Sequence, residues 1–338
     1  MKNKLTDPFL KPFMREINII KHIFTDKTKI FKKGKHIIYI TLSINNDENY
    51  KYIAFVSMLS LLLNCNKTKS FIIYHILCSP DFKESSIGIF KPLLRNYSQN
   101  VEIVFYNMGN LFLNKNANGY PPATFYRVFT PLFIDSDRII HLDCDCIILS
   151  DLYEMYILNI NNNYVYGFYD VIPDGIDYLG INSTKYINAG VILLNLNKIR
   201  KDNKIKELIN ITTSPTFKLK KNDQTAMNYL FYPKIGRLPS KYGLFNFEDK
   251  NDLIKYNKII RTKISWEELE YALKYPRIIH LVLCIPKPWF PSSNYTKCFT
   301  DCAKRNNCSC KKYFDLWHFY ARKTEYYDII SRFTSTNK

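Results

Sequence analysis

Short apolar runs alternate with amphipathic stretches along the first part of the chain. The β-branched segments 36–43, 71–78 and 101–106 predict strands, and segments 50–64 and 82–97 between them predict helices. Strands joined by helices in this way build a doubly wound parallel sheet, which binds ligands at the carboxyl ends of its strands. We therefore expect a Rossmann-like half. The sequence has no G-x-G-x-x-G turn, so a dinucleotide-dependent dehydrogenase is disfavoured.

The rest of the chain adds further elements of both kinds. The patterns predict strands over 138–149, 164–169, 185–196 and 277–282, and helices over 123–134, 197–210, 222–231 and 313–330. No Gly/Ser linker divides the middle of the chain. We therefore expect an α/β protein with one main domain over 35–290, a basic N-terminal extension over 1–34, and a Cys-rich, basic-aromatic C-terminal extension over 291–338.

The charge balance narrows the partners. The chain has 338 residues, with 48 Lys and Arg against 30 Asp and Glu, a net charge of +18. Such a charge favours nucleotide phosphates, acidic lipids or nucleic acid, but no nucleic-acid motif accompanies it, so nucleic acid is not an expected partner. No signal peptide or membrane-length apolar run is visible, which predicts a cytoplasmic location.

The cysteines and aromatic residues of the tail leave alternatives open. Four cysteines lie close together and could bind a metal, form disulfides or stay free: Cys298, Cys302, Cys308 and Cys310. The other five lie in apolar contexts and read as small buried hydrophobes: Cys65, Cys78, Cys144, Cys146 and Cys284. The tail also combines basic and aromatic side chains that suit either peripheral membrane contact or packing on the main domain: Lys311, Lys312, Trp317, Phe319, Tyr320, Arg322, Lys323 and Tyr326.

Two carboxylates two residues apart provide the strongest chemical signal. Asp143 and Asp145 lie in the apolar segment 138–149, and residues two apart on an extended strand project to the same side. Burying both is costly unless a cation lies between them. A divalent cation that carries a diphosphate fits, because oxygen ligands suit Mg²⁺ and Mn²⁺. The similar pair Asp135 and Asp137 reads as turn residues.

The segment HLDCDCIILSDL (141–152) resembles the metal-binding segment of glycosyltransferase family 8, which includes glycogenin and bacterial lipopolysaccharide glucosyl- and galactosyltransferases. Five further segments resemble motifs of that family in the same order: ITLSINNDENY (40–50), ATFYR (123–127), YINAGVILLNL (186–196), NDQTAMNYLF (222–231) and IIHLVLCIPKPW (278–289). The resemblance covers about residues 37–289.

The resemblance implies a GT-A fold, with a Rossmann-like mixed central sheet flanked by helices and a C-terminal helical extension. It implies retaining transfer of a hexose, glucose or galactose, from a UDP-sugar with Mn²⁺ as the cofactor and Mg²⁺ as the alternative ion. The acceptor would be a saccharide, a lipid-linked saccharide or a protein hydroxyl, including a Tyr of the chain itself. The alternative is a non-catalytic protein of the same fold that docks on a membrane or nucleic acid through its basic surface.

The resemblance also assigns roles to residues at matching positions. Asp143, Asp145 and His280 would be the metal ligands, and Asp223 and Gln224 would lie near the anomeric carbon as catalytic residues. A neutral amide is a poor nucleophile, which favours same-face substitution through an oxocarbenium-like state over a double displacement. The donor-binding residues would be Asn46, Asp47, Tyr50, Arg127, Asp143, Cys144, Asp170, Asn188, Ala189, Gly190 and Lys287.

Two departures from the family pattern affect the predicted site. The opening turn is one residue longer, which leaves open whether Asn46 or Asp47 contacts the base or ribose. In the closing motif His280 and Lys287 are seven residues apart rather than six, and the usual Gly is absent from the Leu283-Cys284 pair. We expect the longer loop still to bring Lys287 to the donor.

Overall fold

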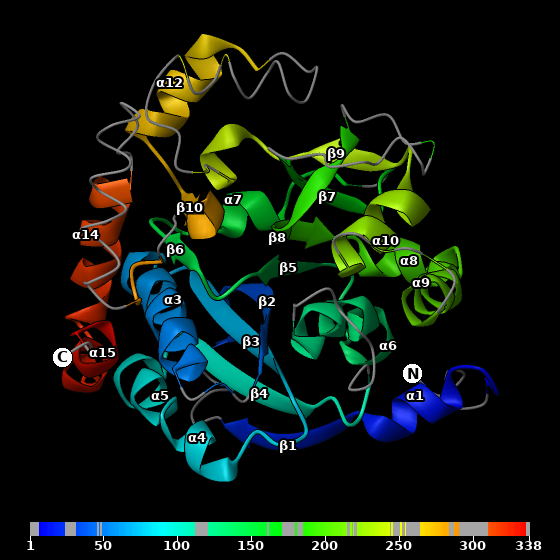
Figure 1. Cartoon of the computed structure of the whole chain (residues 1–338), viewed down its shortest axis with the longest axis horizontal. Helices are drawn as coiled ribbons and strands as arrows, with labels where there is room; N and C mark the ends of the chain where they lie inside the picture. Colours follow the sequence, from blue (N-terminus) through cyan, green and yellow to red (C-terminus); the bar gives the residue numbers. More distant parts are fainter. Residues whose placement is uncertain are drawn as a thin grey trace.

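The computed structural model describes residues 7–23, 32–45, 47, 49–111, 121–160, 162–170, 180, 185–214, 217, 219, 222–243, 245, 251, 254, 264–283, 287–290 and 310–335. The described strands are β1 (Asn18–Ile23), β2 (His36–Ile44), β3 (Ser70–Cys78), β4 (Val101–Asn107), β5 (Ile139–Leu142), β6 (Cys146–Ile148), β7 (Val165–Tyr169), β8 (Ile187–Leu194), β9 (Ile235–Arg237) and β10 (Ile278–His280). Eight of these strands form the central mixed sheet, in the order β1-β4-β3-β2-β5-β8-β7-β9, and β10 pairs with β6 beside it (Figure 1).

Helices cover both faces of the sheet. The α-helices that the structure describes are α1 (Lys11–Glu16), α3 (Tyr50–Asn64), α4 (Glu84–Gly88), α5 (Lys91–Tyr97), α6 (Thr130–Phe133), α7 (Tyr153–Tyr156), α8 (Leu196–Lys201), α9 (Lys204–Thr213), α10 (Asn222–Phe231), α12 (Trp266–Lys274), α14 (Cys310–Ala321) and α15 (Tyr327–Ser335). Short 3₁₀ segments are η2 (Pro122–Phe129), η5 (Ser240–Tyr242) and η6 (Leu281–Leu283). In Figure 1, α3, α4 and α5 lie on one side of the sheet, and α6 lies on the other with α8, α9 and α10.

The central strands supply two hydrophobic cores because successive side chains point to opposite faces. On β3, Tyr74 and Ile76 join the core beneath α3, whereas Leu77 joins the core beneath η2. On β4, Phe105 joins the core beneath α3 and Tyr106 joins the core beneath η2. A sheet buried on both faces explains why these strands are apolar along their whole length in the sequence.

The strand order reverses beside β2, and this reversal places the site. The strands β2, β3 and β4 run parallel in one direction across the sheet, and β5 lies parallel on the other side of β2. Next to β5 the sheet continues with β8, which is antiparallel to it. In open α/β sheets, ligands bind at the carboxyl ends of the strands where the order reverses. The segments that follow β2 and β5 meet at that edge.

Most of the predicted elements are confirmed, but four predicted helices are interrupted. The helix expected over 123–134 consists of the 3₁₀ segment η2 followed by α6. The helix expected over 82–97 divides into α4 and α5, and Pro92 lies in the first turn of α5. The helix expected over 197–210 divides into α8 and α9 at Asn203, whose φ of 53° lies in the left-handed region. The helix expected over 313–330 divides into α14 and α15. The strand β1 and the helix α12 were not predicted.

The single strand predicted over 138–149 is wrong. The strand β5 ends at Leu142, a turn follows in which the Cys146 amide donates to the Asp143 carbonyl at 3.2 Å, and β6 begins at Cys146. The new strand leaves the main sheet and pairs antiparallel with β10. The two carboxylates therefore lie in a turn, and the geometry of an extended strand does not hold for them.

The C-terminal helix α14 packs on the main domain beside α3 (Figure 1). Trp317 and Tyr320 are buried, and the Asn64 amide of α3 donates to the Tyr320 hydroxyl at 2.7 Å. Phe319 stays half exposed under the Lys323 ammonium. No helix among the described residues is long and apolar enough to cross a membrane. Cys298, Cys302 and Cys308 lie outside the described residues, as does the side chain of Cys310.

One partly buried ion pair ties α12 to the edge of the sheet. The Glu268 carboxylate accepts hydrogen bonds from both terminal nitrogens of Arg237 on β9, at 2.7 and 2.9 Å. It also accepts from the amide and the hydroxyl of Ser240. Burial opposes ionisation of Glu268, but Arg237 and Ser240 outweigh burial and lower its pKa to about 2.

This pKa predicts an acid-sensitive contribution to stability. Because the pKa of Glu268 is lower in the folded than in the unfolded chain, its contribution is present above about pH 4.5 and is lost as the pH falls towards 2. We expect E268Q to lower the free energy of unfolding by about 1–3 kcal/mol at pH 7. Urea unfolding of both proteins between pH 2 and 7 measures this. E270Q, on the exposed side of the same helix, is the control. A difference that does not depend on pH would contradict the prediction.

Candidate active site

The turn between β5 and β6 carries the predicted acidic pair and is held from both sides. The Asp143 amide donates to the Gly190 carbonyl of β8 at 2.7 Å, and the Leu281 amide donates to the Asp145 carbonyl at 3.0 Å. Asp143 and Asp145 therefore lie between β8 and the residues that follow β10. Both carboxylates are at the carboxyl edge of the sheet, where the fold predicts a ligand site.

Asp143 has two nitrogen donors of its own. Its Oδ1 accepts from Nη1 of Arg127 on η2 at 3.1 Å and lies 3.2 Å from Nε2 of His141. Burial opposes ionisation, but the charge of Arg127 and the His141 contact hold the pKa of Asp143 well below its usual range. Burial and the nearby guanidinium lower the pKa of His141 to about 4. At neutral pH, Asp143 is ionised and His141 is neutral.

Asp145 faces a second pair of nitrogen groups. Nε2 of His280 lies 3.1 Å from its Oδ1 and 3.8 Å from Oδ2 of Asp143, and Nζ of Lys287 donates to its Oδ2 at 2.9 Å. Burial opposes ionisation, but Lys287 and His280 hold the pKa of Asp145 well below its usual range. Lys287 also donates to the carbonyl of Leu281. The longer closing loop thus still brings Lys287 to the acidic turn.

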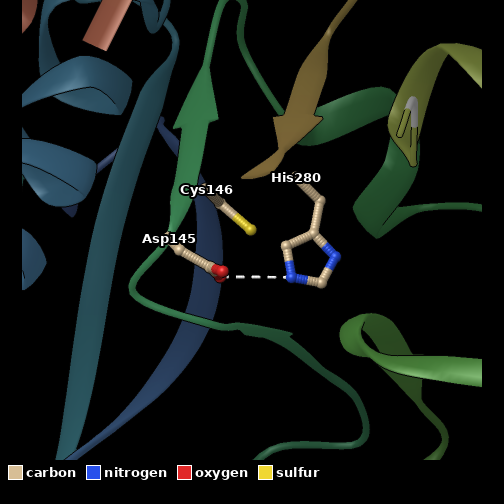
Figure 2. Close-up of side chains that lie close together, drawn as sticks. All are labelled: Asp145, Cys146 and His280. Carbon is tan, nitrogen blue, oxygen red and sulfur yellow. Dashed lines mark ion pairs between the residues drawn. The ribbon is translucent and has the colours of Figure 1, made fainter. Parts of the chain in front are cut away.

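The ladder between β6 and β10 positions the imidazole. His280 is the cross-strand partner of Cys146, the residue after Asp145. Figure 2 shows His280 with Asp145 and Cys146, whose ligand atoms lie within 4.8 Å of one another. This group of carboxylate, thiol and imidazole is the candidate for metal binding among the described residues.

Gly190 lies directly against His280 and Asp143. A Cβ at this position would lie 2.2 Å from Cε1 of His280 and 2.6 Å from Oδ2 of Asp143. Neither group is the free end of a flexible chain, so only a residue without a side chain fits here. The closeness of His280 and Asp143 therefore explains why the N-A-G segment has a glycine at position 190.

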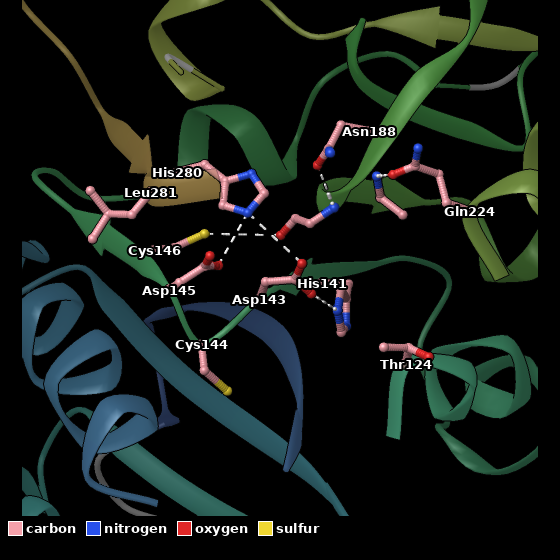
Figure 3. Close-up of polar contacts among 12 residues, drawn as sticks. Thr124, His141, Asp143, Cys144, Asp145, Cys146, Asn188, Gln224, His280 and Leu281 are labelled. Carbon is pink, nitrogen blue, oxygen red and sulfur yellow. Dashed lines mark hydrogen bonds and ion pairs between the residues drawn. The ribbon is translucent and has the colours of Figure 1, made fainter. Parts of the chain in front are cut away.

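A second cluster lies on the other side of β8 and involves the predicted catalytic residues. Figure 3 shows Gln224 and Asn188 beside the acidic turn. The Gln224 side chain accepts from the Ala189 amide at 3.0 Å and donates to Oδ2 of Asp170 at 2.6 Å. The Asn188 side chain accepts from the Gly190 amide at 2.8 Å. Both side chains are fixed by the backbone of β8.

Arg127 joins the two clusters. Its guanidinium is buried, donates to the Ala189 carbonyl at 2.6 Å, and lies with Nε 2.8 Å from Oδ2 of Asp223. Burial raises the pKa of Asp223 to about 7, because the attraction of Arg127 only partly offsets the cost of desolvation. The same guanidinium contacts Asp143 on one side and Asp223 on the other.

The segment after β2 reaches the same edge of the sheet. Burial, together with the nearby Cys144, Asp145 and Asp143, raises the pKa of Tyr50 well above its usual value. The Asp47 carboxylate accepts from the Asn49 amide at 2.9 Å at the start of α3. Cys144 is buried and donates from Sγ to the Ser43 carbonyl at 3.5 Å. Asn46 lies outside the described residues.

The structure therefore brings the predicted metal ligands, Arg127 and Lys287 into one cluster, and places Asp170, Asn188, Asp223 and Gln224 directly beside it. Sequence reasoning did not single out His141 and Cys146, which also lie in the cluster. In the segment HLDCDC, His141 lies two residues before Asp143, and Cys146 directly follows Asp145. From the sequence, Cys146 read as a small buried hydrophobe and His141 carried no prediction.

Comparison with known proteins places the chain among sugar transferases. A probable glycosyl transferase Gly of Streptococcus gordonii is 26% identical over 198 residues, which are 59% of this chain and 24% of that protein. The glycosyltransferase GlyE of Streptococcus pneumoniae is 29% identical over 119 residues, 35% of this chain and 27% of that protein. The chain thus spans about a quarter of the length of these two curated relatives.

Solved structures share the fold. The galactosyltransferase LgtC, solved with donor and acceptor sugar analogs, matches with a TM-score of 0.55 and 19% identity over 79% of this chain and 96% of that chain. GlyE matches with a TM-score of 0.57 and 19% identity over 89% of this chain and 63% of that chain. The fold is the GT-A fold of these glycosyltransferases. The model of the family "Glycosyl transferase family 8" matches residues 41–292, about three quarters of the sequence, and the chain belongs to that family.

Proposed function

We propose that this chain is a retaining glycosyltransferase that moves a hexose, glucose or galactose, from a UDP-sugar to an acceptor hydroxyl in a Mn²⁺-dependent reaction. The observation that carries the proposal is the convergence of Asp143, Asp145 and His280 at the edge of the sheet where the strand order reverses. Family membership supports sugar transfer as the reaction class. The acceptor class is a saccharide, a lipid-linked saccharide or a protein hydroxyl.

The residues at this edge fit a divalent cation. Carboxylate oxygens with one imidazole suit Mn²⁺ or Mg²⁺. Oδ1 of Asp145 is buried, and although Nε2 of His280 lies 3.1 Å from it, it accepts no well-aligned hydrogen bond from the described residues. A cation bound beside it would satisfy such an oxygen. We propose that Asp143, Asp145 and His280 hold the ion. A bound ion supplies positive charge that stabilises a leaving diphosphate.

The two basic residues have different roles in this proposal. The Lys287 side chain is one fifth exposed, so its ammonium can interact both with Asp145 and with a group in the open part of the site. We assign it to the leaving phosphate as a point charge. Arg127 is almost fully buried and contacts Asp143, Asp223 and the Ala189 carbonyl. We therefore assign Arg127 to the orientation of the two carboxylates.

Asp223 and Gln224 are the proposed catalytic residues. The Gln224 amide is held by Ala189 and Asp170 and carries no charge, so it does not suit a covalent intermediate. We propose same-face substitution, in which the carboxylate of Asp223 and the carbonyl oxygen of Gln224 stabilise the positive charge that develops on the sugar ring.

The metal site predicts the effect of two substitutions. D143N and D145N each remove a charged ligand, so we expect a loss of metal-dependent sugar transfer or UDP-sugar hydrolysis greater than about 100-fold. Calorimetry should show Mn²⁺-dependent binding of UDP by the wild-type protein and none by either variant. The double variant D135N/D137N alters the other D-x-D segment and is the matched control.

Two results would contradict this assignment. One is hydrolysis that continues unchanged in EDTA. The other is binding of UDP without any dependence on the metal. Thermal unfolding of each variant must accompany these measurements, because Asp143 is also the partner of the buried Arg127. A docking protein without activity would bind neither UDP nor the ion at this site.

The tight space around Gly190 predicts that a side chain at this position would disturb the proposed metal site. We expect G190A to displace His280 and Asp143 and to weaken Mn²⁺ binding by about 10–100-fold, as misplaced metal ligands do. Calorimetric titration with Mn²⁺ measures this directly. G88A is the control, because a Cβ at Gly88 has no atom within 4 Å. Equal Mn²⁺ affinity in G190A and wild type would place the ion elsewhere.

A further inference from the structure

Cys146 brings a sulfur atom to the proposed metal site. Its Sγ, a carboxylate oxygen of Asp145 and a ring nitrogen of His280 lie within 4.8 Å of one another (Figure 2). The Cys146 side chain is fully buried. The contact of Sγ with the Gly190 carbonyl is long at 4.0 Å. The thiol therefore faces the ligand group rather than a strong hydrogen-bond acceptor.

The strand register explains why this thiol faces the site. Cys146 and His280 are direct cross-strand partners in the antiparallel ladder of β6 and β10, and such partners project to the same face. Cys144, two residues earlier, lies in the turn instead. Its Sγ contacts the Ser43 carbonyl and points away from His280 in Figure 3. The two cysteines of the D-C-D-C segment therefore have different environments.

We propose that Cys146 is an additional ligand of this metal centre and donates through its thiolate. The inference rests on the proposed function, since the ion is the one held by Asp143, Asp145 and His280. On binding, the thiol loses its proton to solvent and the sulfur takes a position on the ion. A set of oxygen, nitrogen and sulfur donors favours Zn²⁺ or Co²⁺ over Mn²⁺. The site should therefore bind the softer ions more tightly than carboxylates and imidazole alone would.

The competing interpretation is that Cys146 only fills space in the core. Sulfur in that role has no effect on ion selectivity. The two interpretations differ in one measurable quantity, which is the ratio of the affinities for Zn²⁺ and Mn²⁺.

Spectroscopy and competition binding test the proposal on the full chain. Co²⁺ added to the metal-free wild type should produce the near-ultraviolet charge-transfer absorption that a cobalt–thiolate bond gives. We expect C146S to lack this absorption and C144S to retain it. We also expect C146S to weaken Zn²⁺ binding by more than about tenfold and Mn²⁺ binding by less than about threefold. Any absorption from the tail cysteines stays in all variants and cancels in difference spectra.

The variant H280A distinguishes a failure of the Cys146 proposal from a failure of the proposed metal site. If H280A loses the ions while C146S keeps both the cobalt absorption and the wild-type Zn²⁺ affinity, the thiol is not a ligand and the proposed function stands. If H280A binds Mn²⁺ and Zn²⁺ as the wild type does, the metal centre lies elsewhere and both proposals fail. Should C146S not fold, C146A tests the same contact, with circular dichroism as the check on folding.

Discussion

The close placement of two carboxylates, the buried Asp145 and the one-third exposed Asp143, is the constraint on which the rest of the site depends. Taking a carboxylate out of water costs several kcal/mol unless charged and hydrogen-bonding partners replace the water. The structure supplies Arg127 to one carboxylate and Lys287 to the other, with an imidazole beside each. These partners come from segments far apart in the sequence, so the two charges can be held together only when the sheet, η2 and the residues after β10 have all assembled.

The elements that the sequence predicts well are those whose own residues give an unambiguous signal. The segments of β2, β3 and β4 are mostly apolar because both faces of the sheet are largely buried there, and α10 has its predicted bounds. Residues 138–149 give the same apolar signal on both sides of the D-C-D triplet, since Ile139, Ile140, Ile147 and Ile148 are all buried. A continuous strand and two strands joined by a turn have the same composition here. Only the pairing of β6 with β10, which is remote in sequence, decides between them.

The candidate site was predictable to the extent that its residues lie in recognisable motifs. The family segments identify Asp143, Asp145, His280 and Lys287, and these side chains do lie together. His141 and Cys146 belong to the same cluster, but Cys146 read as a small buried hydrophobe and His141 carried no prediction. Their positions in the cluster depend on the residues that they face in the folded chain. Cys146 faces His280 through the strand register, and no local pattern contains that information.

The two halves of the site form one electrostatic unit because they share Arg127. The guanidinium lies between Asp143 and Asp223, and the negative charge of Asp143 is one of the causes that raise the pKa of Asp223. Positive charge brought to Asp143 would oppose that repulsion and favour the ionised form of Asp223. The carboxylate proposed to stabilise the sugar cation would then carry its full charge when the ion site is filled. In this proposal, ion binding at Asp143 and the charge of Asp223 are coupled through Arg127, which contacts both carboxylates.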